Sequence, residues 1–363
     1  MTDTPGADGW NADAAASPCN GSGKAPRALG PPVLSALIRS VPEDFLVEEI
    51  LGFEPSGQGE HLFLCVEKRA ANTVWVAQQL ARWAGVPEHA VGYAGLKDRH
   101  AVTRQAFTVH LPGRDAPALE SIAIEGVEVL SATRHARKLP RGALRGNRFR
   151  LRLCGTRGEP QAIAQRLADI AARGAPNRFG EQRFGRDGGN LDAAREMFAG
   201  KRVSRDKRSI LLSAARSELF NRILDERIRR EAWDRGLPGE VFMLDGSHSV
   251  FVAQAGDEAL EARLAAFDIH PTGALWGAGE PRSGEAVRAL EEEVASADPV
   301  LAEGLVRAGL RQERRALRVA VRALEGRMDG DVLSLSFELP AGSYATAVLD
   351  ALGETRDGSR GAA

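Results

Sequence analysis

The chain has 363 residues, 43% of them hydrophobic, which is enough for two domains that each bury a core. No stretch approaches the roughly 18 uninterrupted apolar residues of a transmembrane helix, and the N-terminus lacks the basic start and apolar run of a signal peptide. We therefore expect neither a membrane protein nor a secreted one. The cysteines Cys19, Cys65 and Cys154 form no CxxC pair and no even set, which predicts a reduced, cytoplasmic setting.

The net charge of −1 hides a segregation of charge along the chain. Residues 134–152 contain no acid and eight basic residues, namely Arg134, Arg137, Lys138, Arg141, Arg145, Arg148, Arg150 and Arg152. A charge run is usually a solvated face, but this one would repel itself unless an anionic partner balanced it. A nucleic acid is therefore a candidate partner.

Residues 1–30 are rich in Gly, Ala, Ser, Pro, Asp and Asn without apolar periodicity, which predicts a disordered tail. Residues 21–24 have the Gly-Ser-Gly-Lys pattern of a phosphate-binding loop. However, Pro18 stands where the first glycine belongs and Ala25 replaces the Ser or Thr, so we reject that motif.

The first predicted strand and helix follow this tail. Residues 61–67 alternate, with Leu62, Leu64 and Val66 on one side, as in a strand. Asn72 is expected to cap a helix that ends at Gly85, with apolar positions Val76, Leu80 and Trp83.

Asp98 lies between Lys97 and Arg99 in a segment of small residues. A nearby cation keeps a carboxylate ionised, so Asp98 is a candidate nucleophile or base. Taken alone, Lys-Asp-Arg is more often a solvated turn.

Residues 147–153 alternate strictly and predict a strand with two different faces. Asn147, Phe149, Leu151 and Leu153 share one face, and Arg148, Arg150 and Arg152 share the other. Residues 159–172 predict a helix with Pro160 in its first turn and an apolar stripe of Ile163, Leu167 and Ile170.

The C-terminal half begins with a Gly-rich segment, residues 174–189, that is typical of a boundary. Residues 213–230 predict a helix, and residues 331–338 predict a late strand. Ser343 is expected to cap a final helix that runs to Leu352.

Six blocks carry a family resemblance: residues 42–49, 57–61, 91–104, 141–153, 175–185 and 339–346. In these blocks, in the same order from about residue 33 to about 352, the chain resembles the TruD family of tRNA pseudouridine synthases.

The resemblance implies an α+β fold with a discontinuous catalytic domain. A pseudouridine synthase-type domain, with a mixed, mainly antiparallel sheet flanked by helices, would comprise residues 31–172 and 318–352. Residues 173–317 would form an inserted α/β TRUD domain, and residues 353–363 a flexible tail.

The resemblance also implies an activity, the conversion of uridine to pseudouridine at position 13 of tRNA. This isomerisation needs no cofactor and no metal, which agrees with the absence of a dinucleotide fingerprint and of zinc-site spacing. We expect a monomer whose partner is tRNA.

The resemblance assigns roles to individual residues. Asp98 matches the catalytic aspartate, Phe45 and Tyr344 match residues that contact the target uridine, and Asn147 matches a substrate-contacting asparagine. Tyr344 departs from the phenylalanine expected there. Stacking survives this change, although a buried hydroxyl would need a partner.

Further candidates surround these residues. Phe149 shares the predicted face of Asn147. Arg39 is the candidate cation for Asp98, because the side chains of Lys97 and Arg99 would point away from Asp98 if the segment is extended. The candidates for contact with the RNA backbone are Arg145, Arg148, Arg150 and Arg152.

Each assignment has a structural alternative. Phe45 and Phe149 could be core residues, Asn147 could close a turn, and His100 is better explained as a structural histidine. A non-catalytic RNA-binding module is the main rival function, but it would not need a carboxylate facing an anionic partner. A methyltransferase would need a cofactor loop, which is not visible.

Overall fold

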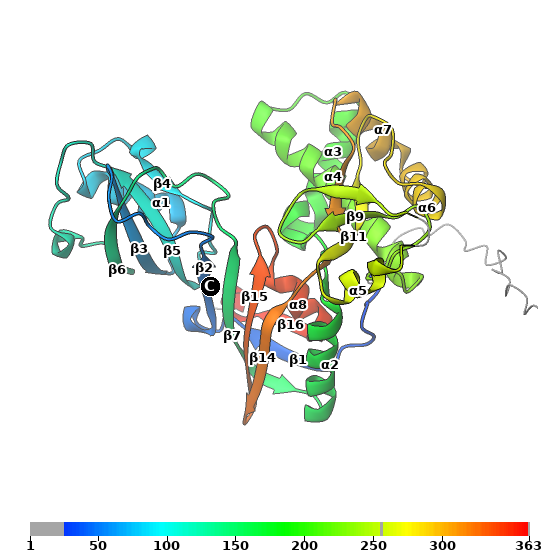
Figure 1. The fold of residues 1–363 in the computed structure, drawn as a ribbon, viewed down its shortest axis with the longest axis horizontal. Helices are drawn as coiled ribbons and strands as arrows, with labels where there is room; N and C mark the ends of the chain where they lie inside the picture. Colours follow the sequence, from blue (N-terminus) through cyan, green and yellow to red (C-terminus); the bar gives the residue numbers. More distant parts are fainter. Residues whose placement is uncertain (1–24, 255–256, 362–363) are drawn as a thin grey trace, which may run out of the picture.

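We describe residues 25–254 and 257–361 of a computed structural model. A sheet of ten strands is its largest element, in the order β14-β15-β7-β2-β5-β3-β6, with β1 and β4 pairing β7 and β5, and β16 pairing β1 (Figure 1). The bounds are β1 Leu34–Ile38, β2 Phe45–Ile50, β3 His61–Arg69, β4 Val91–Tyr93, β5 Val102–His110, β6 Val127–His135, β7 Gly146–Arg157, β14 Arg322–Asp329, β15 Val332–Pro340 and β16 Gly353–Asp357. The pairs β2–β5 and β1–β16 are parallel and the others antiparallel, so the predicted mixed, mainly antiparallel sheet is confirmed.

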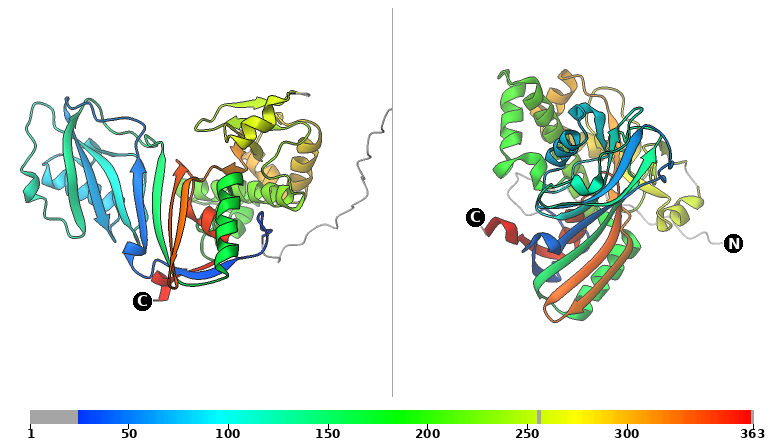
Figure 2. Two further views of the ribbon diagram at one scale, coloured as in Figure 1. Left: turned by 60° about the horizontal axis from the view of Figure 1, so that its bottom comes forward. Right: turned by 90° about the vertical axis from the view of Figure 1, so that its left-hand side faces the viewer.

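Helices cover one face of this sheet on both sides of β2. Helix α1 (Thr73–Trp83) packs on β3, β4 and β5, while α2 (Pro160–Arg173) and α8 (Ala345–Leu352) pack on β1, β7 and β15. Val47 of β2 is paired in register with Thr103 of β5, so their side chains lie on the same face of the sheet. Phe107 shares the face of Thr103, because alternate residues of a strand point to the same side. Since Phe107 packs against α1, that helix covers the face of Val47. The middle of that face, over β2, lies between the two helical layers (Figure 2).

The remaining elements form a smaller body beside the sheet (Figure 1). Its four-stranded sheet has the order β10-β9-β11-β12. The bounds are α3 Gly189–Phe198, α4 Arg205–Arg229, β9 Val241–Leu244, β10 Val250–Val252, α5 Ala259–Ala265, β11 Ile269–Leu275, α6 Glu285–Ser296, α7 Pro299–Arg307 and β12 Glu313–Ala316.

A two-stranded pair joins the bodies: β8 (Ala175–Pro176) runs antiparallel to β13 (Arg318–Val319). The chain thus leaves the large sheet and returns to it at one place. The described part of residues 173–317 contributes no strand to the large sheet. The two-domain division with its stated bounds remains a prediction.

Three local predictions match the structure closely. Asn72 accepts hydrogen bonds from the backbone N–H groups of Val74 and Trp75 and caps α1. Glu159 caps α2, whose first residue is Pro160. The strand predicted at residues 147–153 extends to Arg157 as β7.

Other boundaries were wrong. Helix α4 begins at Arg205, eight residues before the predicted start, because its first turns are charged and exposed and show no apolar stripe. Tyr344 rather than Ser343 is the N-cap of α8, and the Ser343 N–H instead donates to Pro340 O in a turn.

Both predicted tails were too long. Residues 353–357 form β16, which pairs with β1 along all five residues, so this part is not a flexible tail. Arg27 donates to the carbonyl oxygens of Asp350 and Gly353, and Leu29 packs against the core, so residues 27–29 belong to the fold. Residues 1–24 of the predicted tail lie outside the described residues.

Within the described residues, no helix has the length and apolar character needed to cross a bilayer.

Candidate active site

The site is built on the loop of residues 94–101, which joins β4 to β5 over the middle of the covered face. The Lys97 N–H donates to Thr73 Oγ1 at 3.1 Å, and the Asp98 carbonyl accepts from Lys68 Nζ at 3.2 Å. Ala94 O accepts a third bond, at 2.7 Å, from Gly142 N. The loop backbone is therefore fixed from several sides although it has no regular secondary structure.

Arg39 forms the ion pair expected for Asp98. Its Nη2 lies 2.8 Å from Asp98 Oδ2, with the Asp98 side chain 30% exposed and the Arg39 side chain 11% exposed. The other carboxylate oxygen accepts the His100 N–H at 3.0 Å. Asp98 thus keeps one open side while its charge is stabilised by a nearly buried guanidinium.

Two further contacts fix the position of Arg39. Its Nη1 lies 3.1 Å from Asp357 Oδ2 in β16, and its guanidinium carbon sits 4.0 Å from the centre of the Phe45 ring. Arg39 also has a positive φ of 55°, a conformation rare outside glycine. The strand β16, which the sequence analysis missed, holds the Arg39 side chain in place through Asp357.

Lys97 points elsewhere, as expected. Its Nζ lies 2.8 Å from Glu49 Oε1, and both side chains are buried. Glu49 also accepts the Ala106 N–H at 2.9 Å. Arg99 is exposed. Neither neighbour of Asp98 in the sequence is its ionic partner.

Lys68 is a site residue that the sequence analysis missed. It is fully buried, and its ammonium donates to Ala71 O at 2.7 Å as well as to Asp98 O. Burial lowers its pKa from 10.5 to about 8, while the Asp98 carboxylate partly opposes the shift. The sequence did indicate that Lys68 is buried, because position 68 continues the alternation of the inward-facing residues Leu62, Leu64 and Val66.

Phe45 and Phe149 lie on the same face but are packed in the core. Their rings meet edge to face at 6.2 Å, and Phe149 stacks on Phe337 at 5.3 Å. Both are buried, and Arg39 covers Phe45. The structure therefore favours the core interpretation for Phe149, whereas Phe45 also supports the cation of the site.

Asn147 opens the strand β7 next to the site. It is paired in register with Glu49, the partner of Lys97, and with Leu339. The side chain is 9% exposed, and its Oδ1 has no hydrogen-bond partner among the described residues. An orphaned buried amide oxygen typically costs about 1 to 3 kcal/mol, so this atom is available for a ligand.

Tyr344 is 47% exposed at the start of α8. No contact within the described part of the chain joins it to Asp98. It lies near the partly buried Arg315, whose pKa is lowered to about 10 by desolvation, while Tyr344 opposes this shift. Arg315 donates to Asn177 Oδ1 at 2.6 Å and lies over Phe179. Asn177 and Phe179 belong to the Gly-rich segment of residues 174–189.

The side chains of Arg148, Arg150 and Arg152 in β7 point away from Asp98, because these residues alternate with Asn147 and Phe149. Arg148 lies 2.7 Å from Glu338 Oε1 and 3.8 Å from Glu48 Oε2, and Arg152 lies 3.7 Å from Asp44 Oδ1. Glu48 and Glu338 lie in the neighbouring strands β2 and β15, and Asp44 lies in the short turn of 3-10 helix that precedes β2. Of the three, only Arg150 lacks an acidic partner among the described residues.

A comparison with family models decides the family. The model for tRNA pseudouridine synthase D (TruD) matches residues 29–192 and 195–352. The chain belongs to the TruD family.

Curated relatives extend over nearly the whole chain. It is 53% identical to the tRNA pseudouridine synthase D of Xanthomonas axonopodis pv. citri (strain 306), over 92% of this chain and 96% of the relative. It is 51% identical to that of Nitrosococcus oceani, over 90% of this chain and 93% of the relative. A crystal structure of the putative TruD protein from Methanosarcina mazei is similar, with a TM-score of 0.71 and 21% identity, over 92% of this chain and 97% of that one. The last likeness confirms the predicted α+β fold.

Proposed function

We propose that this protein converts uridine to pseudouridine in tRNA, at position 13, with Asp98 as the nucleophile and without a cofactor. The observation that carries the proposal is the Asp98 carboxylate held by Arg39 at 2.8 Å, open on one side, in the block that matches the family's catalytic motif. The names and coverage of the curated relatives support the reaction type and the tRNA substrate.

The reaction is an isomerisation and balances without an oxidant. The bond between uracil N1 and ribose C1′ breaks, a bond between C5 and C1′ forms, C5 loses its proton and N1 gains one. The Asp98 carboxylate attacks either ribose C1′ or the base, and both routes require its ionised form. Arg39 stabilises that form.

The surrounding residues bind and orient the base. A uridine inside folded RNA must be extruded before its C1′ can be reached. The unpaired Oδ1 of Asn147 can accept a hydrogen bond from the uracil N3–H, and the exposed ring of Tyr344 offers a stacking surface. Lys68 fixes the backbone carbonyl of Asp98.

The decisive experiment maps pseudouridine by carbodiimide treatment and primer extension, on tRNA incubated with wild type, Asp98→Asn or Asp115→Asn. Asp115 is an exposed aspartate remote in sequence from the site, so its variant is matched in charge. We expect a stop for position 13 with wild type and Asp115→Asn, and none with Asp98→Asn, which should still bind tRNA.

Two results would contradict the proposal. Turnover near the wild-type level by Asp98→Asn would refute the nucleophile. Binding of tRNA by the wild type without any pseudouridine would indicate the rival function, an RNA-binding module on the same scaffold.

We further infer a cytoplasmic monomer that acts on tRNA without a metal. The described cysteines Cys65 and Cys154 are free thiols, which fits a reducing compartment.

A further inference from the structure

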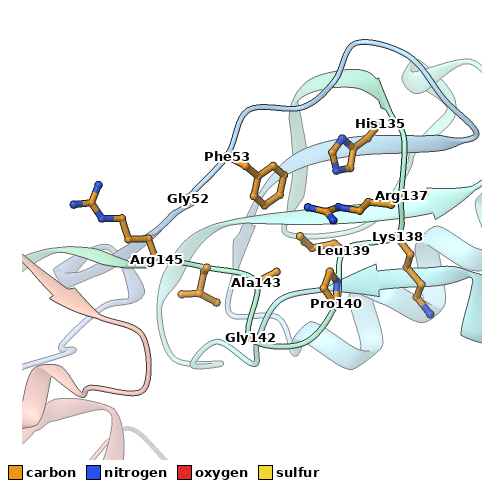
Figure 3. A pocket seen from close by; sticks show the side chains of 11 residues that line it. Gly52, Phe53, His135, Arg137, Lys138, Leu139, Pro140, Gly142, Ala143 and Arg145 are labelled. Carbon is orange, nitrogen blue, oxygen red and sulfur yellow. The ribbon is translucent and has the colours of Figure 1, made fainter. Parts of the chain in front are cut away.

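An open pocket of about 460 Å³ lies between the loop that follows β2 and the segment that joins β6 to β7. Phe53, His135 and Arg137 gather at one end and Arg145 stands at the other, above a floor that includes Leu139 and Ala143 (Figure 3). No acidic residue lines it. Its size falls in the range of small-ligand sites, roughly 300 to 1,000 Å³.

The cations of this pocket differ from those of β7. Within the described residues, neither Arg137 nor Arg145 has a carboxylate within ion-pair distance, whereas Arg148 and Arg152 do. Lys138, also in the lining, donates only to a backbone carbonyl, that of His89. Part of the unneutralised charge of the acid-free run thus lies around this pocket.

An aromatic surface accompanies these charges. Phe53 and His135 stack with ring centres 5.4 Å apart and an angle of 16° between their planes. His135 Nδ1 accepts the Ser56 N–H at 3.1 Å, which places the proton of the neutral ring on Nε2. Burial, and secondarily Arg137, lower the pKa of His135, which favours the neutral form of the ring. Unpaired bases bind such combinations of rings and cations.

The pocket adjoins the active-site loop. Leu144 of the lining lies beside Gly95, where an added Cβ would be 3.8 Å from Leu144 Cδ2 and 3.9 Å from Lys97 Nζ. Arg145 precedes Asn147 by two residues, and its backbone bonds to Ile50 and Ala341. Gly95 thus connects the wall of the pocket to the loop that carries Asp98.

We propose that this pocket binds a nucleotide of the tRNA close to the target uridine, with its phosphate held by Arg137 and Arg145 and its base against Phe53. The inference rests on the proposed function, because it takes the tRNA as the ligand. It assigns the specific RNA contacts to the pocket rather than to the arginine face of β7.

The first test compares the double variant Arg137→Ala/Arg145→Ala with the control Arg157→Ala/Arg327→Ala. Both remove two exposed arginines, but Arg157 ends β7 at the opposite end from Gly146, and Arg327 lies on β14. Affinity for unmodified tRNA is measured by filter binding across a salt series. The pocket variant should bind on the order of tenfold more weakly, and its slope of log affinity against log salt should flatten by about 1.4 for two single-strand contacts.

The second test is Phe53→Leu, which removes the ring without changing the charge. Its affinity should fall by about 5- to 150-fold while the salt slope stays at the wild-type value. A melting curve checks the fold, because Phe53 also packs against Phe63. If this variant is unfolded, the comparison of the two double arginine variants still tests the inference.

Equal losses in the pocket and control variants, or no loss in the pocket variant, would overturn the inference. So would an unchanged affinity for a folded Phe53→Leu protein. Both tests measure binding, so a wild type that binds tRNA but forms no pseudouridine would refute the proposed function and leave the pocket standing.

Discussion

Replacing Lys68 by methionine tests how strongly the buried ammonium beside Asp98 is destabilised. Lys68 is 0% exposed, and its pKa falls from 10.5 to about 8 on folding. At about 1.36 kcal/mol per pH unit, this difference corresponds to a penalty of about 3 kcal/mol for keeping the charge in the folded protein.

The sign of the effect follows from proton binding. Below pH 8 Lys68 is protonated in both the folded and the unfolded protein, and the full penalty lowers the free energy of unfolding. Between pH 8 and pH 10.5 the unfolded chain keeps the proton and the folded protein releases it, so stability rises with pH. The free energy of unfolding of the wild type should therefore gain about 3 kcal/mol relative to Lys68→Met across that window.

At pH 7 the variant should be less stable than the wild type by at most about 3 kcal/mol. The variant escapes the penalty but leaves Ala71 O and Asp98 O without their charged donor, and such bonds contribute about 1.5 to 3 kcal/mol each. Activity should fall nevertheless, because the backbone of Asp98 loses one of its ties.

Urea denaturation at pH 7, 8, 9 and 10 measures the difference, with Lys207→Met as the exposed control. The control curve should run parallel to the wild type. If the curve of Lys68→Met also ran parallel, the ammonium would not be destabilised by burial and the reasoning would be wrong.

Two further predictions concern Tyr344 and the N-terminus. Tyr344→Phe should keep most activity, since within the described residues the hydroxyl forms no hydrogen bond, whereas Tyr344→Ala should lose about 5- to 150-fold in kcat/KM. Single-turnover kinetics that showed Phe as damaging as Ala would contradict the stacking role. Deleting residues 1–24 should leave the melting temperature unchanged. Deleting residues 1–30 should lower the free energy of unfolding by about 1 to 3 kcal/mol, because the carbonyl oxygens of Asp350 and Gly353 lose Arg27 as their donor. Equal melting temperatures of the two truncated proteins would show that Arg27 contributes nothing.

The elements with a clear local pattern were predicted well from the sequence. The alternation of residues 61–67, the Asn72 cap and the Pro160 start each act within a few residues, and the structure has β3, α1 and α2 there. The strand β16 has no such pattern. Residues 353–357 form a strand because β1 offers a parallel partner, a condition set by the tertiary fold.

The same limit applies to the candidate site. The ion pair of Arg39 with Asp98 was anticipated, but only through the family resemblance and the expected direction of neighbouring side chains. Glu48 and Glu338 neutralise Arg148 from strands distant in the sequence, so the charge run alone overstated the arginine face. A run shows where charges are concentrated, whereas pairing across strands decides which of them remain available to a ligand.

The unpaired Oδ1 of Asn147 links stability to function. Nearly all buried polar atoms have partners, so a buried amide oxygen without one calls for an explanation. Asn147 stands opposite Glu49, which already holds Lys97 and the Ala106 N–H. Leaving one acceptor unfilled costs about 1 to 3 kcal/mol in the free protein. Under the proposed function, a uracil N3–H that bonded there would recover that energy only when the base is extruded beside Asp98, so the unfilled acceptor would favour the ligand geometry that the proposed reaction needs.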